Sequence, residues 1–208
     1  MRLETLIGLL VFLLPLAYSP GPGNAFFAAV GASNGMRATV PALAGYHAAT
    51  FGVTVLIGFG IGATAFEHPE FTRILSAAGG IYILWLALGF IRAARTSAEP
   101  KGDLEPKKEK NIGFWAGAMV LLLNPKAYYI IAAMFTQFLH PSEDNATKVV
   151  AIALVFTLNN LLAFTVWVLG GRTLTVLFQN ERARRWIDYL FAASLIGVAA
   201  WMALPLFT

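Results

Sequence analysis

Two short stretches, far apart in the chain, combine proline with asparagine inside long apolar runs. The first is Ser19-Pro20-Gly21-Pro22-Gly23-Asn24, and the second is Asn124-Pro125-Lys126. Proline lacks a backbone N–H and its ring obstructs the preceding turn, so each stretch predicts a broken helix. Within a bilayer, a broken backbone is tolerated only where protein or a water-lined cavity satisfies the freed polar groups. The two stretches therefore predict a small-solute site where the breaks face each other.

Each break predicts a helix that restarts within the membrane and points its first N–H groups into the break. In the first stretch, Gly21 and Gly23 permit the backbone angles that the prolines leave, and a new helix begins near Asn24. In the second, Asn124 is a favoured N-cap and Pro125 occupies the favoured first helical position. The positive ends of two helix dipoles would then face one cavity, which predicts a carboxylate site.

Lys126 follows the second break directly. A cation at the positive end of a helix and at membrane depth is disfavoured by the dipole and by desolvation, which costs about 3 kcal/mol on insertion scales. A bound anion, the carbonyl groups released by the other break, or loss of the proton could offset this cost. The first would make Lys126 a carboxylate ligand, and the third would make it a proton-coupling group. In the alternative interpretation, the prolines are only kinks and the lysine snorkels to an interface.

Three more polar residues lie within apolar runs. His47 could bind the solute or relay protons, or it could be a buried histidine bonded to a neighbouring helix. Asn159 and Asn160 could line the site or join two helices. The chain has no cysteine and no histidine–carboxylate spacing suited to a metal, so no metal site, cofactor or catalytic residue is predicted.

The composition is that of a membrane protein, since 58% of the 208 residues are hydrophobic and only 12% are charged. The net charge of +4 favours an anionic lipid leaflet over nucleic acid as the partner of the basic residues. Six segments are near the length that crosses a bilayer, namely residues 5–30, 38–66, 74–91, 112–139, 149–170 and 186–207. We expect an all-α integral membrane protein with six transmembrane helices, the first and fourth broken at the proline stretches.

Lysine and arginine are distributed unequally between the two sides of the predicted membrane. Eleven of the 15 lie in one set of connections, and Arg2, Arg73 and Lys148 lie on the other side. By the positive-inside rule the first set is cytoplasmic, so both termini face outward.

The charged, proline-containing stretch 96–111 cannot bury enough apolar surface to fold alone and predicts a cytoplasmic linker. It separates a first three-helix repeat, residues 1–95, from a second, residues 112–208. Because three is odd, the second repeat crosses the membrane in the opposite sense. Each repeat opens with a proline-broken helix, which is typical of transporters with inverted repeats and a central solute site.

Several motifs resemble the LysE/RhtB family of amino-acid exporters, over nearly the whole chain. They are Pro20-Gly21-Pro22-Gly23-Asn24, Gly35 with Arg37, Gly45, Gly80-Ile81-Tyr82-Ile83-Leu84-Trp85-Leu86, and Leu123-Asn124-Pro125-Lys126-Ala127 followed by Phe135 and Gln137-Phe138. The resemblance implies export of an amino acid or derivative across a bacterial inner membrane by proton exchange, commonly by a homodimer. The family's motif residues fall on Pro20, Pro22, Asn24, Asn124, Pro125 and Lys126.

The sequence departs from the family in its intramembrane acids. Members often have an acidic residue in the second or fifth span, where this chain has His47 and Asn159-Asn160. A basic side chain would need a buried carboxylate, so we expect a neutral amino acid as the substrate. The alternatives are export of a basic amino acid or metal cation, an accessory membrane protein without transport, and a membrane enzyme. An enzyme would need a converging nucleophile, base or metal cluster, which the sequence does not offer.

Overall fold

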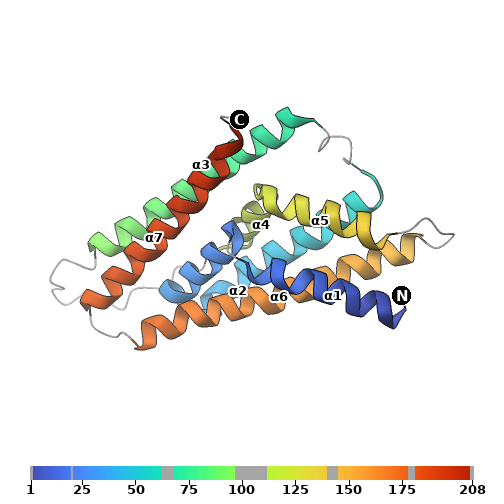
Figure 1. The fold of residues 1–208 in the computed structure, drawn as a ribbon. Helices are drawn as coiled ribbons and strands as arrows, with labels where there is room; N and C mark the ends of the chain where they lie inside the picture. The colour runs from blue at the N-terminus through green and yellow to red at the C-terminus, as the bar shows by residue number, and fades with distance from the viewer. Residues whose placement is uncertain are drawn as a thin grey trace.

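The computed structural model describes residues 2–19, 21–61, 68–96, 112–139, 145–177 and 181–206, and within these ranges every regular element is helical. Figure 1 shows the arrangement. The elements are α1 (Leu3–Tyr18), α2 (Pro22–Gly58), α3 (Pro69–Thr96), α4 (Phe114–Leu122), α5 (Pro125–Phe138), α6 (Asn145–Leu177), α7 (Glu181–Ala203) and a short 3-10 helix, η2 (Leu204–Leu206). The all-α prediction is confirmed for this part of the chain. The predicted linker lies outside it, apart from Thr96.

Four helices in the described residues are long and apolar enough to cross a membrane. They include Pro22–Gly58, Arg73–Arg92, Ala146–Leu174 and Arg185–Ala203. α4 and α5 are bent by 64° at their junction and add a fifth crossing if they form one broken span. α1, the predicted start of the first span, is apolar but too short to qualify by itself. Length and composition thus identify four to five of the six expected spans.

α2 (Pro22–Gly58) is a hairpin of two helical segments that meet at a non-helical residue, Gly35. The rings of Phe27 and Tyr46 lie 5.5 Å apart, whereas 19 residues of straight helix would separate them by about 28 Å. Gly35 makes the reversal with φ 74° and ψ 176°, a conformation open to glycine. The first segment (residues 22–34) therefore packs back on the second (residues 36–58), and Figure 1 shows the chain doubling back there.

Glycines let α2 approach two other helices at backbone contact. A Cβ on Gly31 would overlap the carbonyl of Val168 in α6, and one on Gly171 would overlap the carbonyl of Ala28. The second segment of α2 meets α4 in the same reciprocal way. There, Gly45 contacts the Phe114 carbonyl and Gly117 contacts the Ala42 carbonyl. Small residues at such crossings let membrane helices pack closely.

The buried apolar side chains form two separate clusters. The main cluster comes chiefly from α2, α3, α4, α6 and α7. The second, which we call the α1 cluster, joins α1 to α5 and α6 through Leu9, Leu13, Ile131, Met134, Phe135, Val149, Ile152 and Phe156. Of the buried side chains of α1, Leu9 and Leu13 thus belong to the α1 cluster, and Ala17 belongs to the main cluster.

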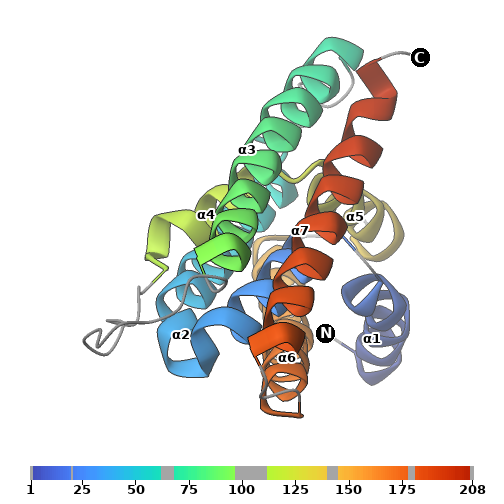
Figure 2. The same ribbon diagram turned by 90° about the vertical axis from the view of Figure 1, so that its left-hand side faces the viewer.

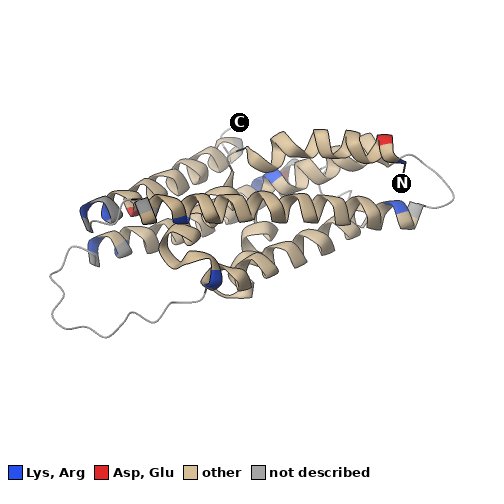
Figure 3. Ribbon diagram, turned by 90° about the horizontal axis from the view of Figure 1, so that it is seen from below, with Lys and Arg blue, Asp and Glu red and all other residues tan. Residues whose placement is uncertain are grey.

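α3 and α7 pack side by side along their length, as the two ribbon views agree (Figures 1 and 2). Figure 3 shows lysine and arginine gathered at the end of the molecule away from the N-terminus. That end holds the C-terminal ends of α3 and α6, the α2 reversal and the start of α7. The lysine and arginine residues that the sequence assigns to one side of the membrane therefore also lie toward one end of the described structure.

Candidate functional site

The first proline stretch ends one helix and starts another, as predicted. α1 stops at Tyr18, Ser19 is extended, and α2 begins at Pro22 with Gly21 as an N-cap that makes no side-chain capping bond. Pro20 lies outside the described residues. The carbonyl groups at the end of α1 find local donors, since Asn24 Nδ2 donates to Ala17 O at 2.8 Å and Ser19 Oγ donates to Leu16 O at 2.8 Å.

The second stretch also breaks and restarts a helix. Asn124 is the N-cap of α5, where its side chain accepts the N–H of Lys126 at 3.1 Å, and Pro125 is the first helical residue. Both predictions are confirmed. Tyr128 satisfies the helix end on the other side of the break, because its hydroxyl donates to Leu122 O at 2.8 Å.

Lys126 bridges the two breaks. Its Nζ donates to Ser19 O at 3.0 Å and to Ser19 Oγ at 2.7 Å. The structure thus contains the second of the three compensations considered above, in which carbonyl groups released by the other break bind the cation. The ammonium lies beside the C-terminal end of α1, where the helix dipole favours positive charge. It is also close to the N-cap of α2, since a Cβ on Gly21 would lie 3.2 Å from Nζ.

The glycines of the first stretch serve packing rather than unusual backbone angles. Gly21 is extended at φ −176°, which any residue can adopt, and Gly23 is part of a regular helix. What they provide is room. A Cβ on Gly21 would lie 3.1 Å from Lys126 Cδ, and one on Gly23 would lie 2.7 Å from Phe164 Cζ. Our prediction that these glycines permit special angles was therefore wrong, because the constraint comes from neighbouring side chains.

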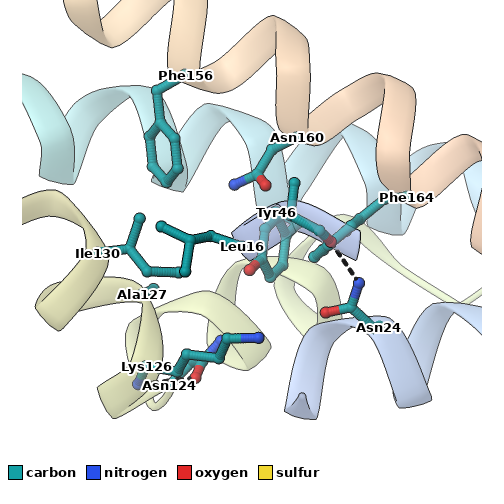
Figure 4. A pocket seen from close by; sticks show the side chains of 11 residues that line it. Leu16, Asn24, Tyr46, Asn124, Lys126, Ala127, Ile130, Phe156, Asn160 and Phe164 are labelled. Carbon is teal, nitrogen blue, oxygen red and sulfur yellow. Dashed lines mark hydrogen bonds between the residues drawn. The ribbon is translucent and has the colours of Figure 1, made fainter. Parts of the chain in front are cut away.

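A small cavity opens between the two breaks and α6 (Figure 4). Its lining residues are Leu16, Ala17, Asn24, Tyr46, Asn124, Lys126, Ala127, Ile130, Phe156, Asn160 and Phe164. The cavity volume is about 20 Å³, enough for roughly one water molecule. An amino acid would need the surrounding helices to separate. The conformation described therefore has no room for an amino acid at this site.

The cavity brings together four of the predicted site residues, namely Asn24, Asn124, Lys126 and Asn160. Pro22 and Pro125 start the half-helices without lining the cavity, and Gly21 and Gly23 lie behind Lys126 and Phe164. His47 and Asn159 do not line it.

His47 is buried next to the cavity in a distinctive environment. Its Nδ1 lies 2.7 Å from Leu43 O. A carbonyl oxygen only accepts, so Nδ1 bears the proton and Nε2 is a free acceptor in the neutral ring. Nε2 is buried without a hydrogen-bond partner, and so is Nδ2 of Asn159. The His47 ring contacts Tyr46 and Phe164, with centroids 5.3 and 5.7 Å away. A buried, unpartnered acceptor of this kind is where a proton or a water would bind.

Tyr46 and Phe164 are cavity residues that the sequence did not single out. Their rings are 4.6 Å apart, and Phe27 packs against both at 5.5 and 5.1 Å. The Tyr46 hydroxyl also faces the Asn124 side chain. Aromatic residues are common in every apolar run of this chain, so no pattern distinguished these two. Ser19 was also missed, although a helix end inside the membrane implies nearby donors and acceptors.

Within the described residues, no group of three or more His, Cys, Asp or Glu side chains could hold a metal ion. The cavity instead combines one cation, three amides and a phenol hydroxyl with apolar walls. Such a lining can bind an anionic group and enclose a short apolar or neutral chain.

The chain is similar to known efflux proteins over most of its length. A cysteine/O-acetylserine efflux protein of Klebsiella pneumoniae is 29% identical over 192 residues, covering 91% of this chain and 92% of that protein. A homoserine/homoserine lactone efflux protein of Salmonella typhimurium is 23% identical over 188 residues, 90% of each. No solved structure matches the chain. The LysE type translocator family matches residues 14–205, which include both breaks and every residue lining the cavity. The chain therefore belongs to the LysE type translocator family.

Proposed function

We propose that this protein is a secondary transporter that exports a small neutral amino acid, or a close derivative, from the bacterial cytoplasm in exchange for protons. Solute and protons would cross by alternating access to the cavity between the two breaks. The observation on which this proposal rests is the position of Lys126, a cation that lines a small cavity where two helices broken within apolar segments meet.

The architecture that we propose with this function is a six-crossing protein made of two inverted repeats, residues 1–95 and 112–208. In this proposal, α1 and the first segment of α2 form one broken span, and α4 with α5 forms the matching one. The other spans are the second segment of α2, then α3, α6 and α7. A reciprocal contact supports the pairing. The first segment of α2 packs on α6, and α4 packs on the second segment of α2, in both cases through facing glycines. Each of these contacts joins part of a broken span to the second span of the other repeat.

The substrate's carboxylate would bind between Lys126 and the N-terminus of α2. The first N–H groups of α2 have no side-chain cap, and Asn24 and Asn124 flank the same space. An anion there gains from the ammonium and from the positive end of the helix dipole. α5 contributes less than we expected, because the side chain of Asn124 already caps it.

The cavity favours a neutral side chain over a basic one. Leu16, Ile130 and Phe156 line it together with the amides, and Lys126 is the charged residue among those that line it. A lysine, arginine or metal-cation substrate would meet a like charge with no carboxylate to offset it. The relatives are named for the efflux of cysteine, O-acetylserine, homoserine and homoserine lactone, which are small amino acids or derivatives without a cationic side chain. They are named as efflux proteins, which argues against an enzyme.

Two groups are candidates for proton coupling. Lys126 could release its proton when the substrate leaves, and His47 has a buried acceptor nitrogen beside the cavity wall. We also propose that the protein lies in the bacterial inner membrane as a homodimer with both termini on the periplasmic side.

Counterflow in proteoliposomes tests the function. Vesicles loaded with one unlabelled amino acid should take up its radiolabelled form, in a panel of homoserine, O-acetylserine, cysteine, alanine and lysine. We expect exchange of a neutral member and none of lysine. Lys126→Met, which keeps the aliphatic stem and removes the charge, should lower exchange by at least about tenfold, the value of one charge-assisted hydrogen bond. Full exchange by Lys126→Met, or no exchange of any amino acid by the wild type, would contradict the proposal.

A further inference from the structure

α1 borders the cavity and contributes to both buried clusters. Its side chains Leu9 and Leu13 belong to the α1 cluster with α5 and α6, whereas Ala17, in its last turn, belongs to the main cluster. On the opposite face, Leu3, Ile7, Val11 and Leu14 are exposed. The last turn of α1 nevertheless forms part of the cavity wall, through Leu16 and Ala17. If α1 moved away from α5 and α6, the cavity would open toward the side where α1 begins.

The polar link between α1 and α5 runs through the side chain that would bind the substrate. Lys126 Nζ donates to both oxygen atoms of Ser19, the first residue after α1. These are charge-assisted hydrogen bonds, which are stronger than neutral ones. Lys126 also lines the cavity. The same ammonium group therefore holds the end of α1 and faces the solute.

We propose, on the basis of the function above, that the Lys126–Ser19 pair is a latch that a substrate carboxylate releases. With the cavity empty, the ammonium binds Ser19 and keeps α1 against α5 and α6. A carboxylate entering beside Lys126 attracts the ammonium as a full negative charge, which the neutral oxygen atoms of Ser19 cannot match. The ammonium turns toward the substrate, Ser19 loses its donor, and α1 is free to swing outward at the break.

The latch makes opening depend on the carboxylate rather than on the volume of the solute. It assigns Ser19 the part of a gating residue that need not touch the substrate. The bond from Asn24 Nδ2 to Ala17 O crosses the same break, so in this proposal it is also given up when α1 moves outward and position 17 becomes exposed.

Cysteine accessibility tests the latch, since the natural chain contains no cysteine. Ala17→Cys adds one sulfur atom to a side chain in the cavity wall, where Ala17 is 6% exposed. The measurement is its rate of labelling by a membrane-impermeant maleimide, in proteoliposomes of known orientation. Leu3→Cys, at a position 71% exposed near the far end of α1, controls for access of the reagent. The probes are homoserine, or the best-exchanged thiol-free amino acid of the counterflow panel, and the amine made by removing its carboxylate.

We expect the amino acid to speed labelling at position 17 and the amine to leave it unchanged. Lys126→Met should raise the rate without substrate by about tenfold, as loss of a charge-assisted hydrogen bond predicts, and should abolish the substrate response. Ser19→Ala, which keeps the backbone carbonyl, should give a smaller rise and serves as the second variant if Lys126→Met does not fold. Labelling at position 3 should not change.

Two outcomes separate the latch from the proposed function. If the wild type exchanges an amino acid but labelling at position 17 ignores substrate, Lys126→Met and Ser19→Ala, the latch is wrong and the pair only satisfies a helix end. If the wild type exchanges no amino acid, the proposed function fails first.

Discussion

At the scale of single residues, the polar groups around the two breaks satisfy the backbone that the prolines set free. Asn24, Ser19 and Lys126 bond to atoms at the end of α1, and Tyr128 bonds to the end of α4. An unsatisfied carbonyl in a hydrocarbon environment costs several kcal/mol, so a break is stable only with such partners. The residues that permit the break thus also position the groups that line the cavity.

Gly23 provides a sharp test of the packing behind the cavity. A Cβ there would lie 2.7 and 2.9 Å from the Phe164 ring, which is itself packed against Phe27 and Tyr46. We expect Gly23→Ala to lower the free energy of unfolding by about 1–3 kcal/mol, as overpacking does, and to impair counterflow. Thermal unfolding in detergent measures the first effect.

The control for Gly23→Ala is Gly52→Ala, because nothing lies within 4 Å of a Cβ at Gly52. Its stability should not fall, since alanine is the better helix former. Phe164→Leu in the Gly23→Ala protein should recover part of the lost stability. A Gly23→Ala protein as stable and active as the wild type would show that the aromatic cluster is looser than the contacts indicate.

His47 allows coupling to be separated from binding. His47→Asn keeps a donor for Leu43 O but removes the ring nitrogen Nε2, which could take up a proton. We expect this variant to lose more of the uptake driven by a pH gradient than of counterflow, which needs no net proton movement. Lys126→Met should lose both to a similar extent. Equal loss of the two activities in His47→Asn would exclude His47 as the proton carrier.

The roles of these residues could be predicted from the sequence only where their contacts are with residues close by in the chain. Asn124, Pro125 and the restart of α2 follow from capping and from proline geometry, which a short stretch of sequence contains. The bond from Lys126 to Ser19 and the contact of Gly23 with Phe164 join distant parts of the chain. No local pattern encodes them.

At the scale of elements, the crossings of α2 with α4 and α6 are set by glycines that allow backbone contact. A side chain at Gly117 would overlap the Ala42 carbonyl, which is backbone and cannot move aside without moving the helix. We expect Gly117→Val to displace α4 and to lower the unfolding midpoint by several degrees, at about 2–4 °C per kcal/mol for a chain of this size. Differential scanning fluorimetry in detergent measures the shift.

The matched control is Gly89→Val in α3, where a Cβ would meet nothing within 4 Å. It removes a glycine from a helix in the same way and should change the midpoint much less. If both variants unfold at the wild-type temperature, the α2–α4 crossing is not as close as described.

Most elements followed from hydropathy, and the discrepancies have physical causes. α3 and α6 extend beyond their predicted spans to Thr96 and Leu177. Polar residues end an apolar run in the sequence but do not end a helix in water. The reversal of α2 coincides with the predicted turn at 31–37, yet helical hydrogen bonding persists on both sides of Gly35. The hydropathy of the sequence predicts which segments cross the membrane, but it does not predict the backbone geometry of the turn between them.

At the scale of the whole molecule, the proposed six crossings and outward termini make a direct prediction. Alkaline phosphatase, which is active only outside the cytoplasm, should be active when fused after Thr208 and inactive when fused within 97–111. An epitope tag before Met1 should be accessible from the periplasm of intact spheroplasts. A tag protected there, with an active C-terminal fusion, would mean that α1 and the first segment of α2 do not together cross the membrane.

The separation of the two apolar clusters has a consequence for how such a protein can diversify. If the proposed latch operates, substitutions in the α1 cluster would change which solutes enter the cavity and how readily they leave, while α2, α3, α4, α6 and α7 keep their contacts in the main cluster. New cargo preferences can therefore arise by altering a minor interface alone. A lineage of exporters could widen or narrow its range of exported metabolites without rebuilding the body that keeps it folded.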